Sequence, residues 1–191
     1  MILQLQFVDW TRGLIVPERN TVVVKIDGTC NNSIPPLPRA AWGVYFGPQS
    51  SINMNGIVDL HLMQSKRRAM IEALWRALLI IYYQVSRDYS LVQIFIVSDS
   101  EYLVNAMTRW IEGWIANNGR TNDGQRVPYF PLIMQCHWLI EAITSDHGPH
   151  RDVKFWFVTP EKNMEAQFLA HQALQALYTH NNRYFYPHQW Y

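Results

Sequence analysis

The sequence lacks the features that mark secreted and membrane proteins. Its two cysteines, Cys30 and Cys136, are too few for a disulfide framework, so we expect two free thiols in a reducing compartment. The first ten residues have neither the basic region nor the cleavage site of a signal peptide. The longest apolar run, residues 73–85, contains Arg76 and is shorter than the roughly 20 residues of a membrane span. We therefore expect a nuclear or cytoplasmic protein without membrane contact.

An excess of charge of either sign is also missing. The chain has 16 Lys and Arg against 15 Asp and Glu, a formal net charge of +1, so nucleic-acid binding would have to rest on a local patch. The hydrophobic fraction of 49% argues against disorder, and 191 residues suit one domain with a full core. We expect a single domain with its core at residues 22–173, an N-terminal extension at 1–20 and an aromatic tail at 180–191.

Hydrophobic periodicity predicts an α/β fold with a mixed five-stranded sheet and helices on both faces. Three consecutive strands joined by short loops suggest an antiparallel meander, expected at residues 22–27, 40–46 and 56–61. Two later strands are expected at residues 93–97 and 154–158. Predicted helices cover residues 66–84, which are apolar on nearly every face, a segment starting at 100 or 101, and residues 110–117, 131–143 and 163–178.

Two acidic residues stand in matching contexts. Asp27 ends the apolar segment VVVKID, and Asp99 follows the apolar segment QIFIVS. Each context indicates a strand that delivers one carboxylate to its end. Such an arrangement usually holds a metal ion.

Five sequence blocks together resemble the type 1 ribonuclease H domain, in the style of fungal ribonuclease H-like proteins. The blocks are IDGTCNNS, RAAWGVYFGP, QSKRRAMIEALWRAL, FIVSDSEYLVNAMTRWIEGW and NMEAQFLA, and they cover roughly residues 22–173 in the expected order. The resemblance implies a ribonuclease H-like fold. It also implies cleavage of the RNA strand of RNA–DNA hybrids by two magnesium ions, which four carboxylates hold.

The resemblance leaves only two of those four carboxylates in this chain. Asp27 matches the aspartate of the first strand, and Asp99 matches the aspartate of the family's T-D-S motif. Met70 stands at the glutamate position of the family's helix, and Gln167 stands at the position of the last aspartate. Glu72 lies two helical residues beyond Met70, a rotation of about 200°, so we expect its side chain to miss the site.

The loop before the last helix is also changed. The family carries a mobile histidine there, whereas this chain has only residues 159–162, whose acidic member is Glu161. An in-line displacement between paired ions needs more carboxylates than two. We therefore expect a catalytically silent domain with no cofactor, or at most a weakly bound magnesium ion at Asp27 and Asp99.

Two groups of residues are candidates for nucleic-acid binding. Asn31 and Asn32 follow the first strand, where the family contacts the 2′-hydroxyls of RNA, although the same residue types are common in turns. Lys66, Arg67 and Arg68 form the densest basic cluster, at the start of a helix where the family contacts phosphates. A solvated helix entrance explains this cluster equally well.

Other candidate sites are weaker. Around Trp110 and Trp114, where some family members have a basic protrusion, the chain offers three arginines, Arg109, Arg120 and Arg126. Cys136 and His137 with His147 and His150 match no common zinc spacing. The aromatic tail suits stacking on bases or contact with a protein, but packing back onto the domain is the simpler expectation; it consists of Tyr184, Phe185, Tyr186, Trp190 and Tyr191.

Two hypotheses of function follow. The first is a catalytically inactive ribonuclease H-like domain that serves as a protein-interaction or assembly module, with a protein partner or by self-association. The second is a domain that binds an RNA–DNA hybrid or duplex RNA. A third and less favoured possibility is a magnesium-dependent hybrid ribonuclease with a non-standard site.

Overall fold

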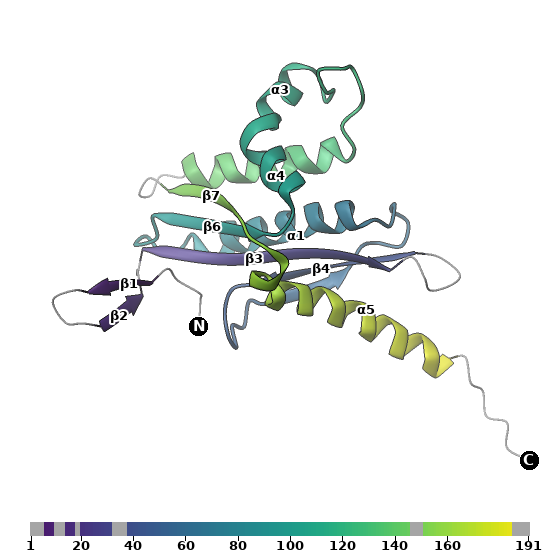
Figure 1. Cartoon of the computed structure of the whole chain (residues 1–191), viewed down its shortest axis with the longest axis horizontal. Helices are drawn as coiled ribbons and strands as arrows, with labels where there is room; N and C mark the ends of the chain where they lie inside the picture. Colours follow the sequence, from purple (N-terminus) through teal and green to yellow (C-terminus); the bar gives the residue numbers. More distant parts are fainter. Residues whose placement is uncertain (1–5, 10–13, 18–19, 32–37, 146–150, 185–191) are drawn as a thin grey trace, which may run out of the picture.

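The protein has a mixed five-stranded sheet with helices on both faces (Figure 1). The computed structural model describes residues 6–9, 14–17, 20–31, 38–145 and 151–184. The strand order is β5-β4-β3-β6-β7, where β3, β4 and β5 are antiparallel and β6 and β7 run parallel to β3. The predicted fold class is therefore confirmed. The strands are β3 (Thr21–Asn31), β4 (Arg39–Tyr45), β5 (Met54–Ile57), β6 (Gln93–Ser98) and β7 (Asp152–Phe157).

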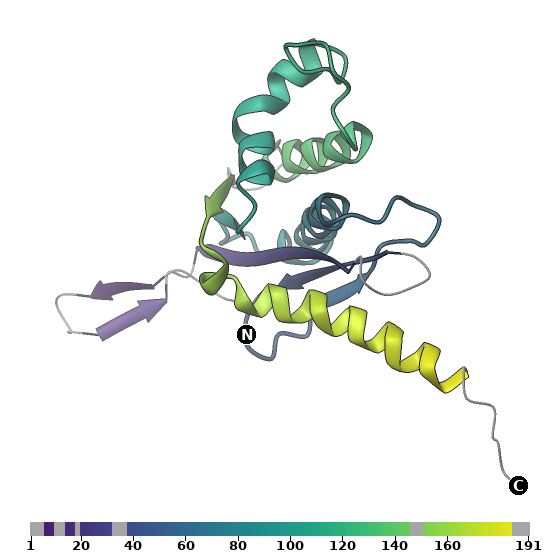
Figure 2. The same ribbon diagram turned by 45° about the vertical axis from the view of Figure 1, so that its right-hand side comes forward.

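One helix lies buried between two layers, as its apolar pattern predicted. Helix α1 (Lys66–Ile80) packs on β3 and β4 and is covered on its far side by α4 (Phe130–Ser145). A π-helical turn, Ile81–Val85, extends α1. Helix α5 (Met164–Tyr184) crosses the opposite face of the sheet over β3, β4 and β5 (Figures 1 and 2). None of the helices in these described segments is long and apolar enough to cross a bilayer.

A helical arm leaves the sheet after β6. It consists of α2 (Glu101–Asn105), a π-helical turn (Ala106–Trp110) and α3 (Ile111–Ala116), and its α3 end stands well away from the strands (Figure 2). The two predicted helices of this region are thus joined by the π-helical turn. Ser100 caps the arm, because its hydroxyl accepts a hydrogen bond from the Leu103 amide.

A hairpin and a 3₁₀ turn had no counterpart in the sequence prediction. Residues 1–20 were expected to be an extension without assigned structure, but β1 (Gln6–Asp9) and β2 (Leu14–Pro17) form an antiparallel hairpin separate from the main sheet. A single 3₁₀ turn, Pro160–Lys162, precedes α5 and makes the loop as short as expected.

Strand β3 does not stop at Gly28, so the prediction of a strand ending at residue 27 was wrong. The strand continues to Asn31 and remains paired with β4, with Gly28 opposite Trp42. A Cβ atom on Gly28 would lie 2.3 Å from the backbone nitrogen of Met70. Gly28 is therefore the point at which α1 approaches the backbone of β3, a use of glycine that does not break a strand.

We expect the substitution Gly28→Ala to destabilise the fold by about 1–3 kcal/mol, because the added methyl group meets helix backbone that cannot move aside cheaply. Gly113→Ala is the matched control. A Cβ at Gly113 meets nothing within 4 Å, so inside α3 it should stabilise by roughly 0.5–1 kcal/mol. Denaturant unfolding of both variants measures the difference. Equal stability of the two would contradict the close contact at Gly28.

Candidate functional site

The two aspartates meet at one end of the sheet. Because β3 and β6 are parallel and Lys25 pairs with Val97, Asp27 within β3 lies beside Asp99, the residue directly after β6. Asp27 is 1% exposed, whereas Asp99 is half-buried. The predicted pair of carboxylates is therefore brought together by the strand register.

Burial and repulsion keep Asp27 from ionising readily. Its pKa is raised from 3.8 to about 7, first by loss of hydration and then by the charge of Asp99. The charge of Lys66 acts in the opposite direction and lowers the pKa of the same carboxyl. Within the described residues, Oδ1 of Asp27 has no hydrogen-bond partner. The site is thus a crowded pair of carboxylates with one nearby ammonium group.

Asn163 ties the start of α5 to this pair. Its side chain is 1% exposed, and its Nδ2 donates to the backbone oxygen of Ile26 at 3.0 Å and to Oδ1 of Asp99 at 3.3 Å. The amide therefore orients the Asp99 carboxylate and fixes where α5 begins. Sequence reasoning did not assign it this role, which depends on contacts between distant segments.

The two replaced positions do not supply metal ligands. Met70 is buried beside the pair, and its sulfur accepts a hydrogen bond from the Ser98 hydroxyl at 3.5 Å. A thioether is a soft, neutral donor, whereas magnesium prefers hard oxygen ligands. Gln167 is half-buried on α5 and brings an amide without charge. In the described part of the chain no three His, Cys, Asp or Glu side chains gather around a common point, so these residues do not fit a pair of magnesium ions.

Glu72 lies away from the site, and the prediction that it would is confirmed. Its carboxylate forms ion pairs with Arg68 at 3.0 Å and with Arg76 at 3.1 Å, one helical turn away on either side. This ion pair also holds the Arg68 side chain beside Glu72, apart from Lys66 and Arg67.

Lys66 and Arg67 line a cavity beside the carboxylate pair. The cavity has a volume of about 210 Å³, and we call it the cationic cavity; its lining consists of Lys66, Arg67, Met70, Ile71, Ser100, Tyr102 and Leu103. The guanidinium carbon of Arg67 lies 4.3 Å from the centre of the Tyr102 ring, a cation–π contact. Residues from α1 and from α2 thus converge on one small hollow, which is mostly apolar and is lined by two cationic side chains.

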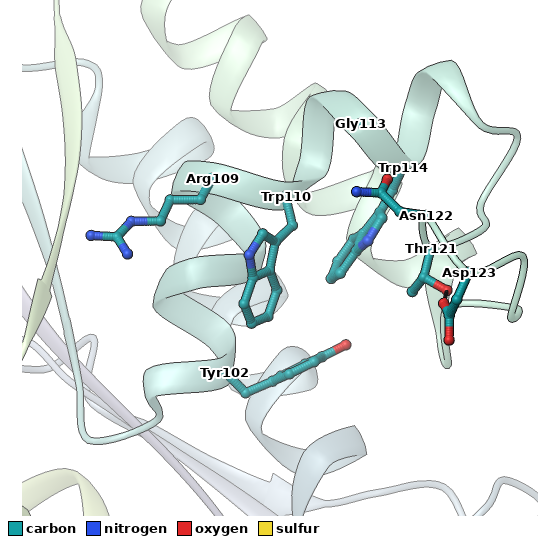
Figure 3. Close-up of a pocket in the computed structure, with 8 residues that line it drawn as sticks. All are labelled: Tyr102, Arg109, Trp110, Gly113, Trp114, Thr121, Asn122 and Asp123. Atoms are coloured by element: carbon teal, nitrogen blue, oxygen red, sulfur yellow. Dashed lines mark hydrogen bonds between the residues drawn. The ribbon is translucent and has the colours of Figure 1, made fainter.

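A larger pocket shares Tyr102 with the cationic cavity (Figure 3). Tyr102, Trp110 and Trp114 have ring centres 5.7–6.4 Å apart and form what we call the aromatic pocket, of about 580 Å³. Its remaining lining residues are Arg109, Gly113, Thr121, Asn122 and Asp123. The sequence signal was the spacing of the two tryptophans, since positions four apart share a face of a helix. The role of Tyr102 was not visible in the sequence.

The remaining predicted residues are spread over the molecule. Asn31 is half-buried and pairs with Arg39 at the end of β3, and Asn32 lies outside the described residues. Glu161 is exposed on the 3₁₀ turn, and a hydrogen bond from Thr159 lowers the pKa of its carboxyl.

The sulfur and histidine candidates do not converge within the described residues. Cys30 and Cys136 are not joined in a disulfide, as predicted. His137 pairs with Glu141 at 3.2 Å on α4. His147, His150 and the tail at residues 185–191 lie outside the described part of the chain.

Comparison with known proteins identifies relatives of both the sequence and the fold. A sequence model described as RNase H matches residues 19–175. Ribonuclease H1 of Homo sapiens is 31% identical over 106 residues, which make up 56% of this chain and 35% of that protein. This chain therefore spans about a third of the human protein's length. Ribonuclease H of Orientia tsutsugamushi (strain Boryong) is 26% identical over 124 residues, or 64% of this chain and 67% of that protein.

A solved structure supports the same fold. RNase H1 from the halophilic archaeon Halobacterium salinarum NRC-1 superimposes with a TM-score of 0.51 at 19% identity, over 82% of this chain and 98% of that one. At this identity the likeness shows the fold alone.

Asp27 makes stability depend on pH. Since its folded pKa of about 7 exceeds the ordinary 3.8, the folded state holds a proton that the unfolded state loses over this interval. The stabilisation by that proton is complete below pH 3.8 and is lost as the pH rises towards about 7. We expect Asp27→Asn to remove this decline. Urea unfolding across the interval, in metal-free buffer, measures it, and parallel curves for the two proteins would contradict the pKa shift.

Proposed function

The chain belongs to the ribonuclease H family, and from this premise we propose that it is a member that binds nucleic acid without cleaving it. The observation that carries the proposal is a contrast between neighbouring parts of one surface. The carboxylate set is reduced to Asp27 and Asp99, whereas cationic and aromatic side chains line the hollows beside it. We take residues 22–173 as the ribonuclease H-like core.

The argument against cleavage is one of charge and ligand type. Two magnesium ions, about 3.5–4 Å apart, stabilise the attacking and leaving oxygens in the family's chemistry, and they need several anionic oxygen ligands. Met70 and Gln167 provide no anionic oxygen, and the raised pKa of Asp27 removes part of the charge that remains near neutral pH. At most one ion would bind weakly at Asp27 and Asp99.

The argument for binding rests on the aromatic pocket and the cationic cavity. Aromatic rings stack on nucleic-acid bases with about 1–3 kcal/mol per base, and Trp110 is 39% exposed for such a contact. Arg109 lines the same pocket, and Lys66 and Arg67 line the cationic cavity, which shares Tyr102 with it. Such side chains suit phosphates of a duplex. We propose an RNA–DNA hybrid as the first ligand to test, because the family resemblance implies it.

A protein-interaction role is the second candidate, favoured by an apolar groove between α1 and α4. The groove has a volume of about 370 Å³ and is lined by Trp75, Leu79, Tyr82, Gln135, Trp138, Leu139 and Ala142. Trp138 is 58% exposed. Exposed aromatic surface of this kind is typical of contacts between proteins. We rank this role second because nothing in the groove specifies the partner, whereas rings next to cations suit a nucleic acid.

We expect the protein to leave a labelled RNA–DNA hybrid intact in magnesium or in manganese, because two-metal chemistry lacks its ligands. Gel analysis of the labelled strand measures cleavage, and Asp27→Asn is the control. Cleavage by the wild type that this substitution abolishes would overturn the proposal. The double variant Met70→Glu with Gln167→Asp tests the cause: calorimetry should then detect magnesium binding if only the ligands have been lost.

We expect Trp110→Ala to weaken hybrid binding by about 1–3 kcal/mol, which is roughly five- to 150-fold in Kd, since it removes an exposed stacking surface. Trp138→Ala should leave hybrid binding unchanged and instead reduce any self-association. Fluorescence anisotropy measures the first effect and analytical ultracentrifugation the second. Because each variant is the control for the other, an exchange of the two results would reverse the ranking of the candidate functions.

A further inference from the structure

The face of the sheet that carries α5 is covered over part of its width. Helix α5 packs on β3, β4 and β5 and leaves most of β6 and β7 uncovered within the described structure (Figure 1). Lys25 of β3 lies on this face, because its ammonium group pairs with Glu165 of α5 at 2.6 Å. The parallel registers place Val97 beside Lys25 and Trp156 beside Val97, and residues paired in this way point to the same side of a sheet. The side chain of Trp156 therefore projects from the uncovered part.

Aromatic and cationic side chains are neighbours on this surface, which we call the open sheet face and define by Phe95, Val97, Lys154 and Trp156. Trp156 is 50% exposed, and Phe95 is half-buried. The ammonium group of Lys154 lies 5.9 Å from the centre of the Phe95 ring. Val97 and Phe95 belong to a small apolar cluster that is separate from the main core. The open sheet face is thus an apolar floor that bears one exposed indole ring and one lysine.

The lysine of this face is available to an anionic ligand. Lys154 pairs with Asp152 at 3.7 Å, and the two side chains are 47% and 45% exposed. A long, exposed ion pair of this kind contributes little, so an approaching phosphate can replace the Asp152 carboxylate. Glu165, the acid that α5 brings to this face, is already paired with Lys25.

This composition suits a single-stranded nucleic acid better than a protein. The centres of protein interfaces are depleted in lysine, whereas here Lys154 is next to both aromatic side chains of the face. Proteins that bind single strands combine aromatic rings, on which bases stack, with cations that follow the phosphates. Sheet faces that carry aromatic side chains stack bases in this way in RNA-binding domains. The bases of a duplex are already stacked on one another, so the ligand of Trp156 has to be an unpaired strand.

The open sheet face adjoins the carboxylate pair. Val97 lies beside Trp156, and Asp99 lies two residues beyond Val97. At the usual rise of a strand these two residues are about 7 Å apart. A hybrid bound at this end of the sheet therefore has any overhanging strand within reach of Trp156.

We infer that the open sheet face binds a single-stranded extension of the hybrid, with one base stacked on Trp156 and a backbone phosphate beside Lys154. The inference rests on the proposed function and adds a second contact to it, outside the aromatic pocket and the cationic cavity. Since every base has a face that can stack, this contact is independent of base sequence.

Anisotropy titrations test the inference by comparing a blunt RNA–DNA hybrid with the same hybrid carrying a single-stranded overhang of about five nucleotides, placed in turn on the RNA and on the DNA strand. With at least one placement the wild type should bind the overhanging hybrid about fivefold or more tightly than the blunt one. Trp156→Ala should lose this gain, whereas Trp156→Phe, which keeps a ring, should retain most of it. Lys154→Met should make the plot of log K against log salt shallower by about one charge for the overhanging hybrid alone.

Trp138→Ala is the matched control, because Trp138 is 58% exposed on α4, on the other side of the sheet, and this variant should keep the gain. Trp156→Ala should bind the blunt hybrid as the wild type does, which also shows that the variant is folded.

Equal affinity of the wild type for blunt and overhanging hybrids overturns the inference and leaves the proposed function intact, as does a gain that survives Trp156→Ala. No gain from the overhang, together with self-association that Trp156→Ala abolishes in analytical ultracentrifugation, assigns the face to a protein contact and also overturns the inference. Failure of the wild type to bind either hybrid overturns the inference and the proposed function together.

Discussion

The close approach of α1 to β3 at Gly28 is the contact on which the rest of this surface depends. A side chain on Gly28 would meet the backbone of Met70, so the helix and strand touch where no larger residue fits. That contact sets Met70 beside Asp27 and places Lys66, one turn earlier on α1, near the same carboxyl. It also turns Glu72 away, towards Arg68 and Arg76. Helix placement therefore decides which charges face the aspartates.

The parts of the structure that could be predicted are those encoded in local patterns. The β-branched run before Asp27 and the apolar segment before Asp99 predicted two strands and one pair of carboxylates, and parallel pairing of β3 with β6 brings them together. The all-round apolarity of α1 predicted its burial. Contacts between distant segments were not predictable in this way. The stacking of Arg67 on Tyr102 and the bond from Asn163 to Asp99 depend on how helices meet the sheet.

The side chains beside the carboxylate pair also have a consequence for stability. Carboxylates gathered for metal binding repel one another when no metal is bound, and burial makes that repulsion more costly. Asp27 still carries this cost, as its raised pKa shows. Met70 adds nothing to this cost, because its apolar side chain, 3% exposed, makes ordinary core contacts. A buried methionine at this position can thus add core stability beside Asp27.

The number of residues in the π-helical turn between α2 and α3 sets the direction in which the side chains of α3 point. An α-helix has about 3.6 residues per turn, so one residue more or fewer in this turn rotates everything beyond it by about 100°. Trp110 ends the turn and Trp114 follows in α3, while Tyr102 precedes it in α2. Whether the three rings share one pocket therefore depends on the number of residues in the turn. The alignment is a property of chain length, which a single inserted or deleted codon would change and most single substitutions in the turn would leave intact.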